Sequence, residues 1–197
     1  MNISDSLIAL IGAVIGGGIT GYYTLKATDK AIRDQNAKEL RRDEKEIDNL
    51  LDALGVELHA LWGFHMRRIG ERIEHLPDGQ PLEFYYPLTQ DYFTIYNSNA
   101  AMIGRIKDAA LREAVVVCYN KCKKVVDGFK YNNELVREYR DLHDASSAPS
   151  IAARTNAKLK ELIDYARVIK EDHFELKGYV EKLLGLLEQR DSKVKNN

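Results

Sequence analysis

Hydrophobic residues are most concentrated in residues 6–25, SLIALIGAVIGGGITGYYTL, a stretch with no charged side chain. As an α-helix, this segment would rise about 30 Å, the thickness of the hydrocarbon core of a bilayer. Six basic residues follow between Lys26 and Arg42, whereas residues 1–5 carry none. By the positive-inside rule, the pattern predicts a single-pass transmembrane helix with the N-terminus outside and the C-terminal domain in the cytoplasm.

The glycines of this segment allow two other interpretations and suggest a partner. A cleaved signal peptide is disfavoured, since residues 1–5 hold an acid and no base and no A-x-A site follows. Gly16, Gly18 and Gly21 match G-x-G-x-x-G, but the charged helical pattern downstream leaves no second strand for a dinucleotide fold. Small residues spaced four apart favour helix association in lipid. The sequence therefore predicts that this segment contacts membrane lipid. It also predicts a homo-oligomer, formed through the glycines Gly12, Gly16, Gly17 and Gly21.

Downstream of the apolar segment, the pattern is helical with an increasingly regular apolar stripe. Residues 26–46 are polar almost all round, which predicts a solvated helical stalk supported by acid–base pairs four residues apart. From residue 47 the apolar positions recur at spacings of four and three, and stalk and stripe together predict one long helix to about His75. The stripe consists of Ile47, Leu51, Leu54, Leu58, Leu61, His65 and Ile69.

Residues 76–87, LPDGQPLEFYYP, interrupt this helix with three prolines and a Pro-Asp-Gly turn signal. Phe84, Tyr85 and Tyr86 form an aromatic cluster there, for which two interpretations stand. The cluster is either a surface for a protein partner or the contact by which the loop packs against the helices.

The helical pattern resumes at Thr89, with Ser98 or Asn99 and then Asp108 as further N-cap residues. After Asp108, one buried stripe is expected in a helix that reaches about His143, formed by Leu111, Val115, Cys118, Cys122, Val125 and Phe129. Residues 144–150 are predicted to form a loop. A last helix over residues 151–189 would turn inward Leu159, Ile163, Ala166, Ile169, Val180, Leu183 and Leu187.

These elements define an all-α fold class: a single N-terminal transmembrane helix, a long stalk helix and a cytoplasmic helical bundle of four main helices. The predicted organisation is residues 1–25 as the anchor, 26–46 as the stalk, 47–189 as the bundle and 190–197 as a frayed tail. No segment shows sustained strand-like alternation.

Composition and motifs restrict the chemistry. The net charge of −1 gives no electrostatic reason to expect nucleic acid as a partner. Cys118 and Cys122, four apart on one helix, are expected to be two small buried side chains. The five histidines form no compact metal signature, and His59 and His65 beside Trp62 are expected to pack with a polar tip at the edge of the bundle. No catalytic residue, metal ligand or cofactor is predicted, and the chain is not expected to be an enzyme.

The stretch from Tyr96 to Tyr119, with Y-N-S-N-A-A-M-I-G-R-I, then D-x-x-L-R, then V-V-x-C-Y, resembles a pattern in small, uncharacterised bacterial and prophage-encoded proteins. The resemblance implies one N-terminal anchor in the bacterial inner membrane and a cytoplasmic helical domain. It carries over no catalytic residue.

Three functional hypotheses follow from the sequence. The first is a non-enzymatic, membrane-tethered helical module, with coiled-coil character, that regulates an unidentified protein partner at the inner membrane. The alternative is a membrane-perturbing effector of anti-phage defence or superinfection exclusion. The third, a dinucleotide-binding enzyme, would require a soluble protein that carries a nucleotide.

Overall fold

The computed structural model describes residues 3–88, 91–145 and 149–195, with side chains described from Gly21 to Ser192 within these ranges. All regular elements in the described ranges are helical, so the chain is an all-α protein as predicted. The elements are α1 (Ile3–His65), the π-helix η1 (Met66–Gly70), α2 (Glu71–Glu74), α3 (Thr94–Ser98), α4 (Ala100–Ile103), α5 (Ala109–Ala145) and α6 (Pro149–Lys195). Three of the described helices are long, whereas four main helices were predicted.

The prediction of a single-pass inner-membrane protein, with the N-terminus outside and the C-terminal domain cytoplasmic, is wrong. Over the described residues, no helix combines the length and the apolar character needed to cross a bilayer. The side chains of Gly12, Gly16 and Gly17 lie outside the described residues.

The chain divides into two compact units, residues 1–48 and residues 49–197, and α1 contributes to both. In the first unit, every side chain of residues 21–45 is exposed to solvent. Polar pairs one helical turn apart support this segment, including Gln35 with Glu39 at 3.0 Å and Arg42 with Glu46 at 2.9 Å. These contacts are typical of a solvated helix.

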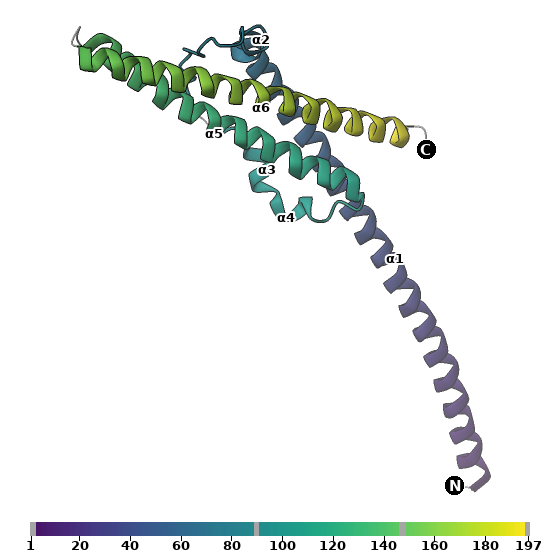
Figure 1. The fold of residues 1–197 in the computed structure, drawn as a ribbon. Helices are drawn as coiled ribbons and strands as arrows, with labels where there is room; N and C mark the ends of the chain where they lie inside the picture. The colour runs from purple at the N-terminus through teal and green to yellow at the C-terminus, as the bar shows by residue number, and fades with distance from the viewer. Residues whose placement is uncertain (1–2, 89–90, 146–148, 196–197) are drawn as a thin grey trace. The chain divides into compact units, whose positions relative to one another are not determined.

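The second unit is built on three long helices. α5 and α6 run antiparallel along one another as a helical hairpin (Figure 1). The end of α1 runs parallel to α5, because Leu54 and then His65 meet Tyr119 and then Phe129. It runs antiparallel to α6, where Asp52 pairs with Arg190 and Trp62 stacks on His173. The connection over residues 75–108 must therefore return along the length of the bundle before α5 begins.

Apolar stripes explain the packing of these helices. The six residues of the predicted α5 stripe, from Leu111 to Phe129, are all buried, which confirms that prediction. On α6 the predicted stripe is out of phase at its start: Leu159 and Ile163 are only half-buried, whereas Leu162 is fully buried. The observed buried stripe of α6 keeps spacings of four and three throughout: Leu162, Ala166, Ile169, His173, Leu176, Val180, Leu183 and Leu187.

The long first helix does not continue to His75 as a regular α-helix. It widens into the π-helical turn η1, a feature that often marks functional positions. Gly70, buried at the end of this turn, allows a close approach: a Cβ there would lie 2.5 Å from Met66 Sδ and 3.3 Å from His173 Cε1. At Gly70 the backbone of η1 therefore comes close to the His173 side chain of α6.

The connection between α2 and α5 is held by side chains of α5. Asn133 pairs with Tyr86 through two hydrogen bonds, accepting from its backbone N–H at 2.8 Å and donating to its carbonyl at 2.6 Å. The buried Asn132 donates to the carbonyls of Leu82 and Phe84, both at 3.2 Å. Two adjacent amides on α5 thus fix the position of this loop.

The predicted helix starts meet different outcomes. Asp108 caps α5 by accepting hydrogen bonds from the backbone N–H groups of Ala110 and Leu111, which confirms that prediction. Asn99 precedes α4 but donates its side-chain amide to the Ile95 carbonyl, so it does not act as an N-cap acceptor. Thr89 lies outside the described residues. α5 ends at Ala145, and α6 begins at Pro149 and continues past Gln189 to Lys195.

Candidate functional site

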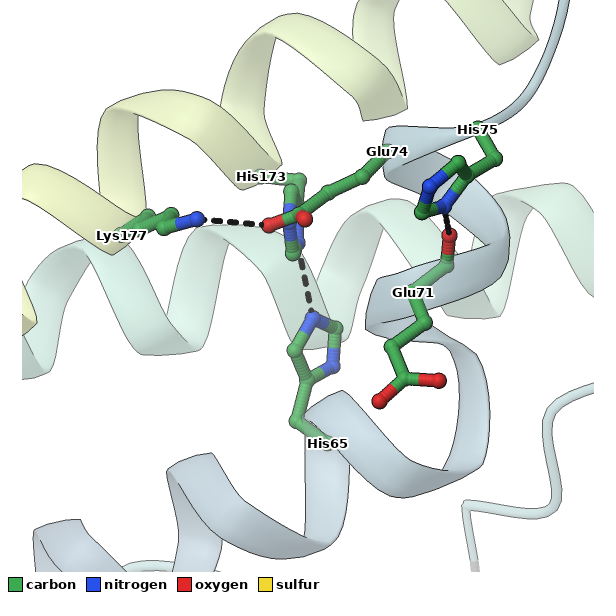
Figure 2. A network of polar contacts seen from close by, with 6 residues as sticks. All are labelled: His65, Glu71, Glu74, His75, His173 and Lys177. Atoms are coloured by element: carbon green, nitrogen blue, oxygen red, sulfur yellow. Dashed lines mark hydrogen bonds and ion pairs between the residues drawn. The ribbon is translucent and has the colours of Figure 1, made fainter.

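A chain of polar side chains links the end of α1, α2 and α6. His65 Nε2 lies 3.0 Å from His173 Nδ1, and His173 Nε2 lies 3.2 Å from a carboxylate oxygen of Glu74. The same oxygen accepts a hydrogen bond of 2.9 Å from Lys177 Nζ. Figure 2 shows how the four side chains converge from three elements, with the π-turn between His65 and Glu74. We call His65, His173, Glu74 and Lys177 the histidine network.

The hydrogen bonds determine which ring nitrogens of this network carry a proton. The Glu74 carboxylate can only accept, so His173 Nε2 carries a proton and donates it toward Glu74. In a neutral ring, His173 Nδ1 is then an acceptor, and His65 Nε2 must donate to it. His65 Nδ1 is left as an unprotonated nitrogen, for which no described residue provides a hydrogen bond.

Burial keeps both histidines neutral near pH 7. Burial, reinforced by the proximity of His173, lowers the pKa of His65 to about 4. Burial also lowers the pKa of His173, whose side chain has no exposed surface, although the Glu74 carboxylate opposes part of this effect. In the other direction, hydrogen bonds from Lys177 and then His173 lower the pKa of Glu74. The network therefore holds one carboxylate and one ammonium beside two uncharged rings.

Aromatic rings cover the two histidines. Trp62 stacks on both, with ring centroids 5.3 Å from His65 and 5.6 Å from His173. Phe129 of α5 lies against His65 at 5.9 Å and against Tyr86 at 4.7 Å. The two histidine rings are thus covered by residues of α1 and α5, and water has little access to His173.

A cavity of about 60 Å³ lies beside this aromatic cover. Its walls come from α1, α5, α6 and the residues around Tyr86 and Phe93, and they are almost entirely apolar. His65 is the histidine that both lines the cavity and belongs to the network. A more open and more polar cleft of about 300 Å³ shares the side chains of Leu88, Tyr92, Phe93 and Val126 with it.

A second buried polar cluster surrounds Glu57. Its carboxylate accepts hydrogen bonds from the backbone N–H groups of Ile95 and Tyr96, at 2.8 and 3.3 Å, and from the Tyr119 hydroxyl at 3.0 Å. Burial and the neighbouring carboxylate raise the pKa of Tyr119. All these partners are backbone or packed side chains, so Glu57 joins α1, α3 and α5 and serves the fold.

The predicted partner-surface residues separate in the structure. Tyr86 is buried against Phe129, and Phe84 is half-buried, with Arg72 above its ring at 5.7 Å. Tyr85 alone is largely exposed, at 56 %. Most of the cluster therefore packs the loop against the helices, the second of the two interpretations. A partner surface stays a prediction for Tyr85.

The two cysteines, Gly21 and the candidate metal-ligating residues also bear on the sequence-based predictions. Cys118 and Cys122 are free and buried, as predicted, and their mutual hydrogen bond together with burial raises the pKa of Cys122. Gly21 faces open space, because a methyl group placed on its Cα would meet nothing within 4 Å, so this chain alone gives it no packing contact. Among the described residues, no group of three or more His, Cys, Asp or Glu side chains is arranged to hold a metal ion.

Sequence reasoning placed His65 and Trp62 near one another but missed His173, Glu74 and Lys177. One signal was available: His173 follows Ile169 by four and precedes Leu176 by three, which places it on the buried stripe of α6. Glu74 and Lys177 had no such signal, because their partners come from another helix.

Comparison with protein-family models, curated proteins and solved structures finds no match to this chain. The resemblance to bacterial and prophage-encoded proteins therefore stays a prediction.

Proposed function

We propose that this chain is a non-enzymatic helical interaction module that regulates a protein partner. The observation that carries the proposal is the exposed segment of α1: residues 21–45 form a continuous helix in which every side chain is open to solvent. Helices gain most of their stability from packing an apolar face, and this segment buries no side chain against the described residues. A partner helix would supply it.

The exposed segment offers a partner a row of apolar side chains. Leu25, Ile32 and Leu40 are 70, 52 and 59 % exposed and recur at intervals of seven and eight, close to one face of a helix. Burying them in an interface would stabilise the complex by roughly 1–2 kcal/mol for each side chain. The partner we favour is a second copy of this chain, which presents the same row.

The arrangement of the titratable groups supports a non-enzymatic role. His173 is completely buried and bonded to two neighbours, and Glu57 is held by backbone N–H groups. Side chains committed in this way stabilise the fold and do not reach a substrate.

Site-specific photocrosslinking in the producing cells tests the proposal. A crosslinker at Ile32 should give a discrete adduct, whereas one at Asp34, on the opposite face of the helix, should not. A self-adduct would migrate near twice the chain mass of 22.4 kDa. The Ile32 adduct should disappear when Leu25 and Leu40 are both changed to Gln.

The matched control changes Ala27 and Ala31, on the opposite face, to Gln and should leave the adduct intact. Equal crosslinking from Ile32 and Asp34, or no adduct from either position, would contradict an interaction through this face.

A further inference from the structure

The cavity beside Trp62 and His65 has the features of a ligand site. It is a recess between packed helices, walled by apolar and aromatic side chains, and it meets one ring with a strongly lowered pKa. Such a combination is typical of small-molecule sites in proteins. Side chains that form its walls include Leu58, Trp62, Phe93, Val125, Phe129 and Val180.

The one polar group that His65 offers to the cavity determines which functional group the ligand needs. The order of the hydrogen bonds from Glu74 through His173 makes His65 Nε2 a donor to His173. The remaining ring nitrogen, Nδ1, is therefore an acceptor that no described residue occupies. A ligand that donates one hydrogen bond would satisfy it.

The charge of the cavity excludes ionic ligands. Lys177 and Glu74 neutralise one another on the far side of His173, and both histidine rings are uncharged. A charged group would lose its hydration among apolar walls without meeting an opposite charge. The ligand is therefore neutral.

The volume limits the size of the ligand. One water-sized sphere occupies about 10–15 Å³, so a cavity of about 60 Å³ holds roughly four to six such spheres. An engineered apolar cavity that accepts benzene is about 150 Å³. The present cavity is smaller but is open on one side, so a slender aliphatic chain can enter it end-on more easily than a flat aromatic ring.

We propose that this cavity binds a small neutral molecule with a short aliphatic body and one hydrogen-bond donor, of the class of short-chain alcohols. The hydroxyl donates to His65 Nδ1, and the chain lies against Trp62 and the valines of α5 and α6. The site is separate from the exposed face of α1, so each proposal stands or falls independently.

Trp62 allows a direct test, because it is the single tryptophan of the chain. Its fluorescence in the full-length protein is titrated with n-butanol, diethyl ether and n-butylammonium, three probes with the same number of non-hydrogen atoms. We expect a saturable change with n-butanol, binding about tenfold weaker with the ether, which cannot donate, and no saturation with the cation. Equal binding of alcohol and ether would overturn the assignment of a donor-selective site.

Two valine substitutions locate the response. Val126→Phe fills the cavity from its half-buried rim and should abolish saturation, whereas Val168→Phe, on an exposed position of α6 outside the cavity, should not. A saturable response that persists in V126F, or a wild-type response that never saturates, would overturn the site.

If V126F does not fold, methyl NMR of the wild-type chain shows whether n-butanol binds in the cavity. Shifts on n-butanol addition that concentrate on Val125 and Val180 support the site. Shifts that are equally large at the exposed Val56 and Val168 would show non-specific binding and overturn it.

Discussion

The Tyr119 hydroxyl of α5 donates a hydrogen bond of 3.0 Å to the Glu57 carboxylate of α1, inside the bundle. The same carboxylate receives the backbone N–H groups of Ile95 and Tyr96. One acidic side chain thereby holds three segments that are distant in sequence.

Glu57→Ala should lower the free energy of unfolding by about 3 kcal/mol, because it leaves several buried donors without an acceptor. Tyr119→Phe, which removes a single donor, should cost about 1 kcal/mol. Urea denaturation followed by circular dichroism measures both. Tyr131→Phe is the control, since Tyr131 is 42 % exposed and its bond to Glu161 is at the surface. A cost for E57A no larger than that for Y131F would show that this cluster does not stabilise the fold.

The histidine network predicts a pH dependence of stability. The pKa of His65 is about 4 in the folded chain, against an ordinary value of 6.5, so the unfolded chain binds more protons between these values. The contribution of His65 to the free energy of unfolding should be fully present above pH 6.5. It should fall as the pH drops from 6.5 toward 4, by up to about 1.4 kcal/mol per pH unit. His173, whose pKa is also lowered, adds to the same trend.

Denaturant titrations at several pH values between 4 and 7.5 measure the slope of the free energy of unfolding against pH. His65→Gln should reduce it, whereas His75→Gln, at an exposed position whose ring bonds only to the Glu71 carbonyl, should leave it unchanged. Identical slopes in wild type and H65Q would contradict the role of His65.

Asn133→Ala should release the loop around Tyr86, because both of its hydrogen bonds to the Tyr86 backbone are lost. We expect faster amide exchange and faster proteolytic cleavage in residues 82–88, with little change in the exchange of α5 and α6. Hydrogen–deuterium exchange measures the effect. Asn120→Ala, an exposed position on α5, is the matched control. Unchanged exchange at residues 82–88 in N133A would mean that other contacts hold the loop.

Gly185→Ala should stabilise the chain by about 0.5–1 kcal/mol, since Gly185 lies inside α6 and a methyl group there would meet nothing within 4 Å. Gly79→Ala should do the opposite, because Gly79 has φ +79° in the turn after α2. Thermal unfolding of the two variants provides the comparison. A lower melting temperature for G185A than for wild type would contradict the open environment of this position.

Much of the fold could be predicted from hydrophobic periodicity. The stripe from Leu111 to Phe129 was correct because each position is buried by the same neighbouring helices along its whole length. On α6, several apolar residues crowd the turn that holds Leu159, Leu162 and Ile163, and only the position of the neighbouring helices decides which of them faces inward. The π-turn at Met66–Gly70 had no local signal, since it arises where Gly70 lets α1 approach α6.

The N-terminal prediction went wrong for a different reason. It interpreted residues 6–25 as a transmembrane helix because they carry no charge, but no helix in the described residues combines the length and the apolar character needed to cross a bilayer. The candidate site was only half accessible to sequence reasoning. His65 and Trp62 are neighbours on one helix, whereas His173 contacts them from a helix more than a hundred residues later, and Lys177 joins the network through Glu74.

The antiparallel pairing of α1 with α6 has a consequence for the order of synthesis. Leu187 packs beside Gly55, and Arg190 pairs with Asp52, so the final turns of the chain cover one of its earliest buried helices. At about 5–20 residues per second, roughly 7–28 s separate the synthesis of the two segments. Until α6 has been synthesised, the apolar face of α1 around Gly55 lacks the side chains that bury it in the folded chain.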